Sequence, residues 1–187
     1  LPVEVSLGGL RGGEIDIPGA VSSQFTTALL LVAPYLQGGL TLVVSGDRVS
    51  NSYIEMTVAV MREFGARIEC VENEAGLRVV VSEGAYLPRC YAIEPDASSA
   101  SYPLAVAAIC GGAVRVEGLT ERSVQGDASF CRVLERMGCE VLQDERGTIV
   151  RRTSPLRGIG VDMADISDLV PTLAVVAAFA EGTTEIH

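Results

Sequence analysis

The sequence predicts an α/β fold made of repeated β-α-β-α-β-β units, each with a mixed four-stranded sheet and two helices. The first observation behind this prediction is that a similar strand–helix–strand stretch occurs three times. The glycines between its helix and second strand, Gly39, Gly112 and Gly182, lie 73 and 70 residues apart. A further helix follows in the first two copies and ends at Gly65 and Gly138, again 73 residues apart. The chain therefore holds two complete units and the start of a third.

The first copy is predicted to contain every element of the unit. Its elements are a strand at 15–17, a helix at 25–36, a strand at 40–44, a helix with its apolar face at Ile54, Val58, Met61 and Phe64, and hairpin strands at 67–71 and 77–81. A strand–helix–strand crossover favours parallel pairing, and the closing hairpin adds an antiparallel strand. We therefore expect a mixed sheet with both helices against one face.

The second copy repeats this order, and the third is shorter. The second is predicted as a strand at 91–94, a helix at 102–109, a strand at 113–116, a helix with apolar positions at Phe130, Val133, Leu134 and Met137, and hairpin strands at 140–142 and 148–150. The third is predicted as a strand at 159–162, a helix at 169–180 and a strand at 183–186. Residues 1–5 have the pattern of the last strand of a preceding unit.

The connection between the first two copies is predicted to be a domain crossing. Residues 84–90 include Pro88 and lie between the hairpin of one copy and the first strand of the next. We therefore assign residues 1–88 to one domain and residues 89–187 to another. The chain begins Leu-Pro rather than with Met, so we expect it to be part of something longer.

Composition argues against several classes of protein. Hydrophobic residues make up 48% of the 187 residues, enough for a core, and no run is long and charge-free enough to span a bilayer. The net charge is −10 and all fourteen basic residues are arginine, which argues against nucleic-acid or acidic-membrane binding. The start of the chain lacks the pattern of a signal peptide. Five cysteines without a CxxC or Cys/His pairing predict buried, reduced thiols in a cytoplasmic protein rather than a zinc site.

A small polar cluster stands where the first strand hands over to a helix: Ser22, Ser23 and Gln24. The first N–H groups of a helix are unsatisfied, and the helix dipole favours negative charge there. Two hydroxyls and an amide at this position suit a phosphate or a carboxylate. Serine is also a good N-cap, so capping alone is a sufficient explanation at this point.

Ser50 and Tyr53 stand at the start of the second helix of the first copy. Both helices of a unit follow the same kind of strand-to-helix loop, so this second set of hydroxyls is expected to lie near the first. Capping by Ser50 or Asn51 is the alternative. In the second copy Asp96 makes capping sufficient, and we interpret that copy as mainly structural.

Asp168 opens the apolar helix of the third copy. The helix N-terminus favours an ionised carboxylate and burial disfavours it. Such a group is able to take a proton from a substrate hydroxyl, and a plain N-cap is the alternative. Asp47, Glu121 and Asp127 lie in predicted loops, and we interpret them as solvated.

The sequence resembles the 5-enolpyruvylshikimate-3-phosphate synthase family (3-phosphoshikimate 1-carboxyvinyltransferases). The resemblance covers the whole chain and is carried by residues 1–3, 9–13, 21–25, 50–54, 96–102, 125–127 and 181–184. It implies the enolpyruvyl transferase fold, with two domains of three β-α-β-α-β-β units each. It also implies transfer of the enolpyruvyl group of phosphoenolpyruvate to the 5-hydroxyl of shikimate 3-phosphate, by addition and elimination, with no metal or organic cofactor.

The same resemblance implies roles for individual residues. The positions that match contacts to shikimate 3-phosphate are Ser22, Ser23, Gln24, Ser50 and Tyr53. Gln24 also matches a contact on the phosphoenolpyruvate side. Asp168 matches the family's acid that contacts the 5-hydroxyl and is the candidate for its base.

The resemblance also implies that parts of the active site lie elsewhere. The family's lysines and arginines that hold both anionic substrates, and the glutamate that helps protonate the methylene carbon, match positions before Leu1 and after His187. We therefore expect the 187-residue chain alone to be inactive or nearly so. A UDP-N-acetylglucosamine enolpyruvyl transferase is one alternative, which the Ser-Ser-Gln triplet and residues 96–102 disfavour. A non-catalytic module that folds alone or pairs with a complementary fragment is the other.

Overall fold

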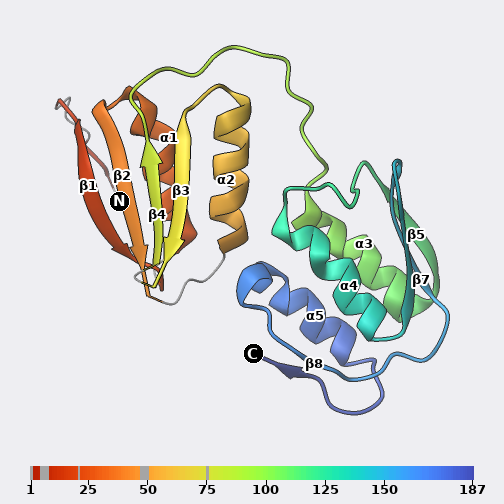
Figure 1. Cartoon of the computed structure of the whole chain (residues 1–187). Coiled ribbons are helices and arrows are strands. Elements are labelled where there is room, and N and C mark those ends of the chain that lie inside the picture. Colours follow the sequence, from red (N-terminus) through yellow and green to blue (C-terminus); the bar gives the residue numbers. More distant parts are fainter. Residues whose placement is uncertain (1, 5–8, 21, 47–50, 75) are drawn as a thin grey trace. The chain divides into compact units, whose positions relative to one another are not determined.

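The computed structural model describes residues 2–4, 9–20, 22–46, 51–74 and 76–187. By its internal contacts the chain divides into two compact units. The first unit comprises residues 1–49 and 57–89, and the second comprises residues 50–56 and 90–187. Each unit is a layer of helices against a sheet (Figure 1).

The first unit contains a four-stranded mixed sheet, as predicted. Its strands are β1 (Arg11–Pro18), β2 (Gln37–Ser45), β3 (Ile68–Asn73) and β4 (Gly76–Val81), in the order β1-β2-β4-β3. β1 and β2 pair in parallel, and the other neighbours pair antiparallel. The parallel pair places the carboxyl ends of β1 and β2 at one edge of the sheet, which is where α1 (Ser23–Val32) begins.

The two predicted helices of this copy are both present. α1 runs into a short 3₁₀ turn at Ala33–Tyr35, and α2 spans Asn51–Glu63. The predicted apolar positions Ile54, Val58 and Met61 of α2 are each at most 4% exposed. Within the first unit, Thr27 Oγ1 on α1 and Thr57 Oγ1 on α2 form a 3.0 Å hydrogen bond, which holds the two helices side by side.

The second copy folds in the predicted order except for its first strand. Its elements are α3 (Ala97–Cys110), β5 (Gly112–Glu117), a 3₁₀ turn (Gly126–Ser129), α4 (Phe130–Arg136), β6 (Cys139–Asp144) and β7 (Gly147–Arg152). The sheet has three strands in the order β5-β7-β6, all antiparallel. The prediction of a four-stranded mixed sheet is therefore correct for the first copy and wrong for the second.

The strand predicted at 91–94 does not form because its polar side chain bonds to a loop. The Glu94 carboxylate accepts hydrogen bonds from Ser123 Oγ (2.5 Å), Val124 N (3.3 Å) and Gln125 Nε2 (3.0 Å). Ile93, which the strand prediction counted as apolar, is 88% exposed. Side-chain contacts to residues 123–125 thus replace the backbone pairing that a strand would make.

The third copy supplies β8 (Gly160–Val161), a 3₁₀ turn (Ala164–Leu169), α5 (Val170–Ala177) and β9 (Glu185–Ile186). β8 and β9 pair in parallel, as the repeat predicts. The described part of the predicted first strand, residues 2–4, is not a strand.

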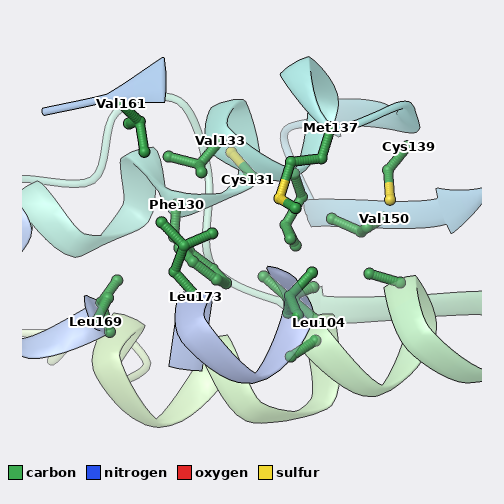
Figure 2. Packing of buried hydrophobic residues seen from close by; sticks show 14 of the residues in the cluster. Leu104, Phe130, Cys131, Val133, Met137, Cys139, Val150, Val161, Leu169 and Leu173 are labelled. Atoms are coloured by element: carbon green, nitrogen blue, oxygen red, sulfur yellow. The ribbon is translucent and has the colours of Figure 1, made fainter. Parts of the chain in front are cut away.

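The core of the second unit joins the second and third copies. Leu104 of α3, Phe130 of α4 and Leu173 of α5 are each at most 1% exposed and pack together, as Figure 2 shows. Met137 at the end of α4 and Val150 on β7 are fully buried in the same cluster. Because α5 shares this core, the third copy is an integral part of the second unit.

The cysteines only partly match their prediction. All five are free, but Cys70, Cys90 and Cys110 are exposed, and only Cys131 and Cys139 are buried. Cys70 lies on β3, Cys110 ends α3, and Cys90 lies in the irregular connection between β4 and α3. None of the helices that the structure describes is long and apolar enough to cross a membrane.

Candidate active site

The predicted cluster Ser22-Ser23-Gln24 forms the start of α1 in the first unit. Ser22 is the N-cap, and its Oγ accepts a hydrogen bond from the Gln24 backbone N–H at 3.4 Å. Ser23 is 8% exposed, and the Gln24 side chain is exposed. No acidic residue lies in the first turn of α1. The helix start therefore combines capping with the positive end of a helix dipole and an exposed amide.

A second polar pair lies at the same edge of the sheet. Ser45, the last residue of β2, donates from Oγ to Asp16 Oδ1 at 2.8 Å, and its carbonyl accepts from Gly19 N at 2.7 Å. These bonds fix the loop that leads from β1 into α1. The polar start of α1 is thus held by the sheet rather than by α1 alone.

In the second unit, Tyr53 brings two carboxylates together. Its hydroxyl lies 3.1 Å from Asp127 Oδ2 and 3.1 Å from Asp168 Oδ2. A phenol has one proton, so it donates to one of these oxygens at a time. Burial, then the negative charge of Asp127, then the hydrogen bond with Asp168 raise the pKa of Tyr53. The hydroxyl is therefore a donor over the whole physiological pH range.

Asp127 is buried, which corrects its interpretation as a solvated loop residue. It lies in the 3₁₀ turn Gly126–Ser129 and is 4% exposed. Its Oδ2 accepts from Ser98 Oγ as well as from Tyr53. Its Oδ1 is buried and has no hydrogen-bond partner among the described residues. The short polar loop motif does not predict this burial, because the burial depends on how the 3₁₀ turn packs against the rest of the unit.

Asp168 does not cap α5, so the capping alternative is wrong. It lies inside the 3₁₀ turn Ala164–Leu169, and the cap residue of α5 is Leu169, which makes no side-chain cap bond. The Asp168 side chain is exposed and points its Oδ2 to the Tyr53 hydroxyl. Of the described residues, none forms an ion pair with Asp127 or Asp168.

The start of α2 is anchored close to these acids. Ser52 donates from Oγ to the carbonyl of Asp165 at 2.8 Å. Gly126 approaches so closely that a Cβ added to it would lie 2.3 Å from the Ser52 Cβ. Tyr53 is therefore held by its own helix turn as well as by its hydroxyl. Ser50, the other predicted residue here, lies outside the described residues.

The second copy contributes to this cluster as well as capping its own helix. Asp96 caps α3 as predicted, accepting from Ser98 N (3.0 Å) and Ser99 N (3.2 Å), and hydrogen bonds from Ser99 lower its pKa. The Ser98 hydroxyl is left to bond to Asp127. The interpretation of this copy as mainly structural therefore misses one contact of the site.

The whole chain, residues 1–187, matches the family model described as EPSP synthase (3-phosphoshikimate 1-carboxyvinyltransferase). The chain belongs to this family. Curated 3-phosphoshikimate 1-carboxyvinyltransferases are similar to it along nearly its full length. The relative from Methanoculleus marisnigri is 46% identical over 99% of the chain, and one from a Shewanella species is 42% identical over 100%. The chain spans about 43% of the length of each.

Two solved structures share the fold. An EPSP synthase from Acinetobacter baumannii aligns with a TM-score of 0.70 and 23% identity, over 95% of this chain and 40% of that one. The enolpyruvyl transferase NikO from Streptomyces tendae aligns with a TM-score of 0.68 and 23% identity, over 92% and 43%. The predicted α/β class of repeated units, as in the enolpyruvyl transferase fold, is confirmed.

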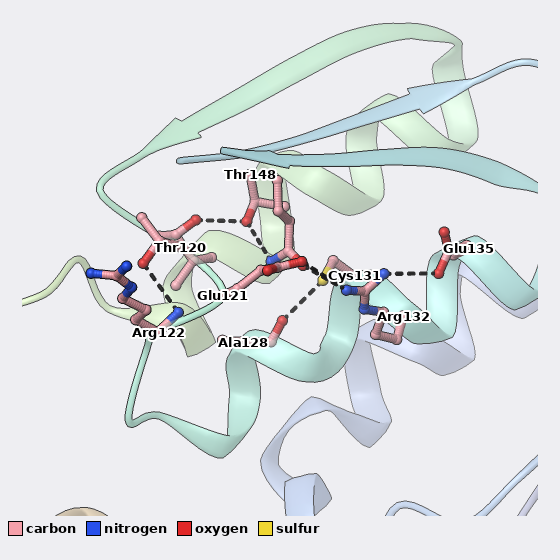
Figure 3. A network of polar contacts seen from close by, with 10 residues as sticks. Thr120, Glu121, Arg122, Ala128, Cys131, Arg132, Glu135 and Thr148 are labelled. Atoms are coloured by element: carbon pink, nitrogen blue, oxygen red, sulfur yellow. Dashed lines mark hydrogen bonds and ion pairs between the residues drawn. The ribbon is translucent and has the colours of Figure 1, made fainter. Parts of the chain in front are cut away.

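A separate polar cleft of about 540 Å³ lies beside α4. Figure 3 shows the polar contacts of Arg132, which lines the cleft. Its only charged donor among the described lining residues, Arg132, is already bound to Glu121 (3.4 Å), Glu135 (3.3 Å) and Gln143 Oε1 (3.0 Å). Glu121 is exposed, as predicted. An arginine shared between two carboxylates is a poor anion site, so this cleft does not compete with the Tyr53 cluster as an active-site candidate.

The acids of the Tyr53 cluster are suited to binding hydroxyl groups. Over the described ranges, no group of three or more histidine, cysteine, aspartate or glutamate side chains is arranged to hold a metal ion. Two carboxylates and a phenol within hydrogen-bond reach instead offer acceptors for the O–H groups of a polyol.

Proposed function

We propose that this chain is the central part of an enzyme that transfers the enolpyruvyl group of phosphoenolpyruvate to the 5-hydroxyl of shikimate 3-phosphate. Its support is membership of the EPSP synthase family over residues 1–187 and the names of the relatives. The observation that carries the proposal is an exposed carboxylate, Asp168, 3.1 Å from the Tyr53 hydroxyl. A base beside a hydroxyl-binding group is what this chemistry requires.

In this proposal Asp168 is the general base. The 5-hydroxyl oxygen of shikimate 3-phosphate attacks C2 of phosphoenolpyruvate while its proton passes to Asp168 and a proton is added at C3. The tetrahedral adduct then loses phosphate from C2 and a proton from C3, which restores the double bond. Asp168 is exposed and forms no ion pair with any described residue, so its carboxylate is open to a substrate hydroxyl.

The hydroxyl and amide groups hold the phosphorylated substrate. We assign Ser22 and Ser23 to the phosphate of shikimate 3-phosphate, because the start of α1 has a helix dipole and no acidic side chain in its first turn. Gln24, whose side chain is exposed, reaches both this substrate and phosphoenolpyruvate. Tyr53 binds the sugar-like ring, and the assignment of Ser50 to the same ring rests on the resemblance alone.

The proposal extends to the setting of the reaction. Residues 1–88 and 89–187 belong to different domains of the whole enzyme, which is cytoplasmic and needs no metal or organic cofactor. A net charge of −10 disfavours nucleic acid and anionic membranes as partners. The same charge leaves two anionic substrates without counter-charge, so the isolated chain turns over neither.

A hybrid enzyme tests the proposal. This chain replaces the matching segment of the Methanoculleus marisnigri relative, 186 residues at 46% identity, and phosphate release is measured with phosphoenolpyruvate and shikimate 3-phosphate. We expect activity in the hybrid, none in the isolated chain, and a kcat lowered by roughly 10²–10⁴-fold in Asp168→Asn. Asp165→Asn, on the same 3₁₀ turn with an exposed side chain, is the matched control and should leave kcat unchanged.

Other outcomes decide between the alternatives. A hybrid that uses UDP-N-acetylglucosamine and not shikimate 3-phosphate would establish the other enolpyruvyl transferase. A folded hybrid that turns over neither substrate, beside an active unmodified relative, would make this chain a non-catalytic module. Turnover by the isolated chain at a rate near that of the unmodified relative would refute the assignment of the counter-charges to other parts of the enzyme.

A further inference from the structure

We propose that Asp127 is a positioning residue of this site, which draws the Tyr53 proton to itself so that Asp168 is left to accept the substrate hydroxyl. This inference rests on the proposed function for the role of Asp168. The contacts, burial and proton count of the cluster carry the inference.

The burial of Asp127 makes it the stronger competitor for the proton. Asp127 is 4% exposed, and only its Oδ2 accepts bonds from described residues. A buried carboxylate has lost its hydration and depends on the donors around it. Asp168 is exposed, so water compensates it when no protein group donates. The Tyr53 proton therefore stabilises Asp127 more than it stabilises Asp168.

Which carboxylate accepts the Tyr53 proton determines how well Asp168 acts as a base. A carboxylate that accepts a hydrogen bond is stabilised in its charged form and is a weaker base. If Tyr53 donated to Asp168, the substrate hydroxyl would have to displace it before transferring its own proton. With the proton held by Asp127, Asp168 receives the substrate hydroxyl, and Tyr53 still lies 3.1 Å away to orient it.

The position of Asp127 is fixed from both sides. Gln125 donates from Nε2 to Glu94 Oε2 (3.0 Å) and to the Pro95 carbonyl (2.8 Å), and its Oε1 accepts from Ala97 N at 2.9 Å. These bonds tie the turn that carries Asp127 to the start of α3. The Ser98 hydroxyl on α3 then donates to Oδ2. Asp127 is thus placed by its neighbours rather than by Tyr53.

The charged groups that act on the Tyr53 hydroxyl come from two elements packed against the start of α2. Among the described residues they are Asp127 on the 3₁₀ turn 126–129 and Asp168 on the turn 164–169.

The test is a double-mutant cycle in the hybrid enzyme. In Asp127→Asn the neutral amide oxygen attracts the phenol proton less, so Tyr53 donates to Asp168. We expect kcat to fall by roughly tenfold or more and the acid limb of its pH profile to move to lower pH. In the Tyr53→Phe background, where no phenol proton exists, Asp127→Asn should move that limb less, because only the loss of the Asp127 charge near Asp168 remains.

A purely structural role for Asp127 predicts a different result. The Asp127→Asn effect would then persist unchanged in the Tyr53→Phe background and would appear as lost stability without a shifted pH limb. Either finding overturns the inference. Asp144→Asn is the matched control, because Asp144 is an exposed aspartate bonded to Arg115 on the sheet of the same unit. It should move neither kcat nor the limb.

A measurement on the 187-residue chain separates this inference from the proposed function. The chain has five tyrosines, so the ionisation of Tyr53 is followed as the ultraviolet absorbance that the Tyr53→Phe chain lacks. Asp127→Asn should lower the raised pKa of Tyr53, because the charge of Asp127 contributes to it. Ser98→Ala, which removes the other donor to Asp127, should raise that pKa further and covers the case in which Asp127→Asn does not fold. No change in either variant refutes the contact. An inactive hybrid with both shifts present refutes only the proposed function.

Discussion

Replacing Gly126 by alanine should displace Tyr53 from both carboxylates. The added Cβ would lie 2.3 Å from the Ser52 Cβ, whereas carbon atoms in contact stay about 3.5 Å apart. The two segments must therefore separate by about 1.2 Å, and hydrogen bonds of 3.1 Å from Tyr53 then exceed the usual limit. Overpacking of this kind costs about 1–3 kcal/mol of unfolding free energy, and Tm falls by roughly 2–4 °C for each kcal/mol.

The assay combines thermal unfolding, followed by circular dichroism, with the tyrosine absorbance titration. Gly126→Ala should lower Tm and bring the raised pKa of Tyr53 down toward its ordinary value. Ser52→Gly removes the clashing carbon, so the double variant should regain the Tm of Ser52→Gly alone. That single variant is the proper reference, because it also lacks the 2.8 Å bond from Ser52 to the Asp165 carbonyl. A Gly126→Ala chain with unchanged Tm and unchanged tyrosine titration would refute the close-approach argument.

Two further predictions concern the stability of the chain. Phe130→Ala should lower the free energy of unfolding in urea by about 3–5 kcal/mol, because Phe130 is 1% exposed. Phe25 is 62% exposed, so Phe25→Ala should lower it by under about 1 kcal/mol. Equal losses in the two variants would contradict the described core. Folding raises the pKa of Tyr53, so Tyr53 contributes to the free energy of unfolding. This contribution is complete below the pKa of tyrosine in the unfolded chain, about 10, and is lost as pH rises above it. In Tyr53→Phe the free energy of unfolding should therefore fall less steeply as pH rises above about 10. Part of the remaining fall is due to Tyr86, because burial also raises its pKa. An unchanged pH dependence would count against the burial of the Tyr53 phenol.

The repeat made most of the fold predictable from sequence. Glycine spacing located the helix ends, and Gly65 and Gly138 follow α2 and α4 with positive φ, as a left-handed helix end requires. The apolar spacing of α2 and the strand pairing of the first copy followed from periodicity alone. The strand at 91–94 did not, because four residues of suitable pattern cannot reveal that Glu94 bonds to a distant loop.

The candidate site was predictable in its parts but not in its arrangement. Ser22 and Asp168 both precede an apolar helical stretch, and this position predicts an N-cap for each. Only Ser22 is a cap. Asp168 precedes the cap residue of α5, because the 3₁₀ turn continues to Leu169. The two positions differ by one residue, and helix boundaries are not defined more closely than that. Asp127 was missed because burial of a loop aspartate depends on the turn and on α3, which sequence periodicity does not describe.

In the proposed function the Ser22 hydroxyl has two roles, as the N-cap of α1 and as a hydrogen-bond donor to the phosphate. Its oxygen lone pair receives the Gln24 N–H, while its proton is directed elsewhere. Replacement by alanine removes both at once, so lost ligand affinity in that variant would be inseparable from a loosened helix start. Aspartate caps as well as serine does but brings a negative charge and no donor. Comparing the two replacements separates what Ser22 does for α1 from the phosphate contact that we propose for it.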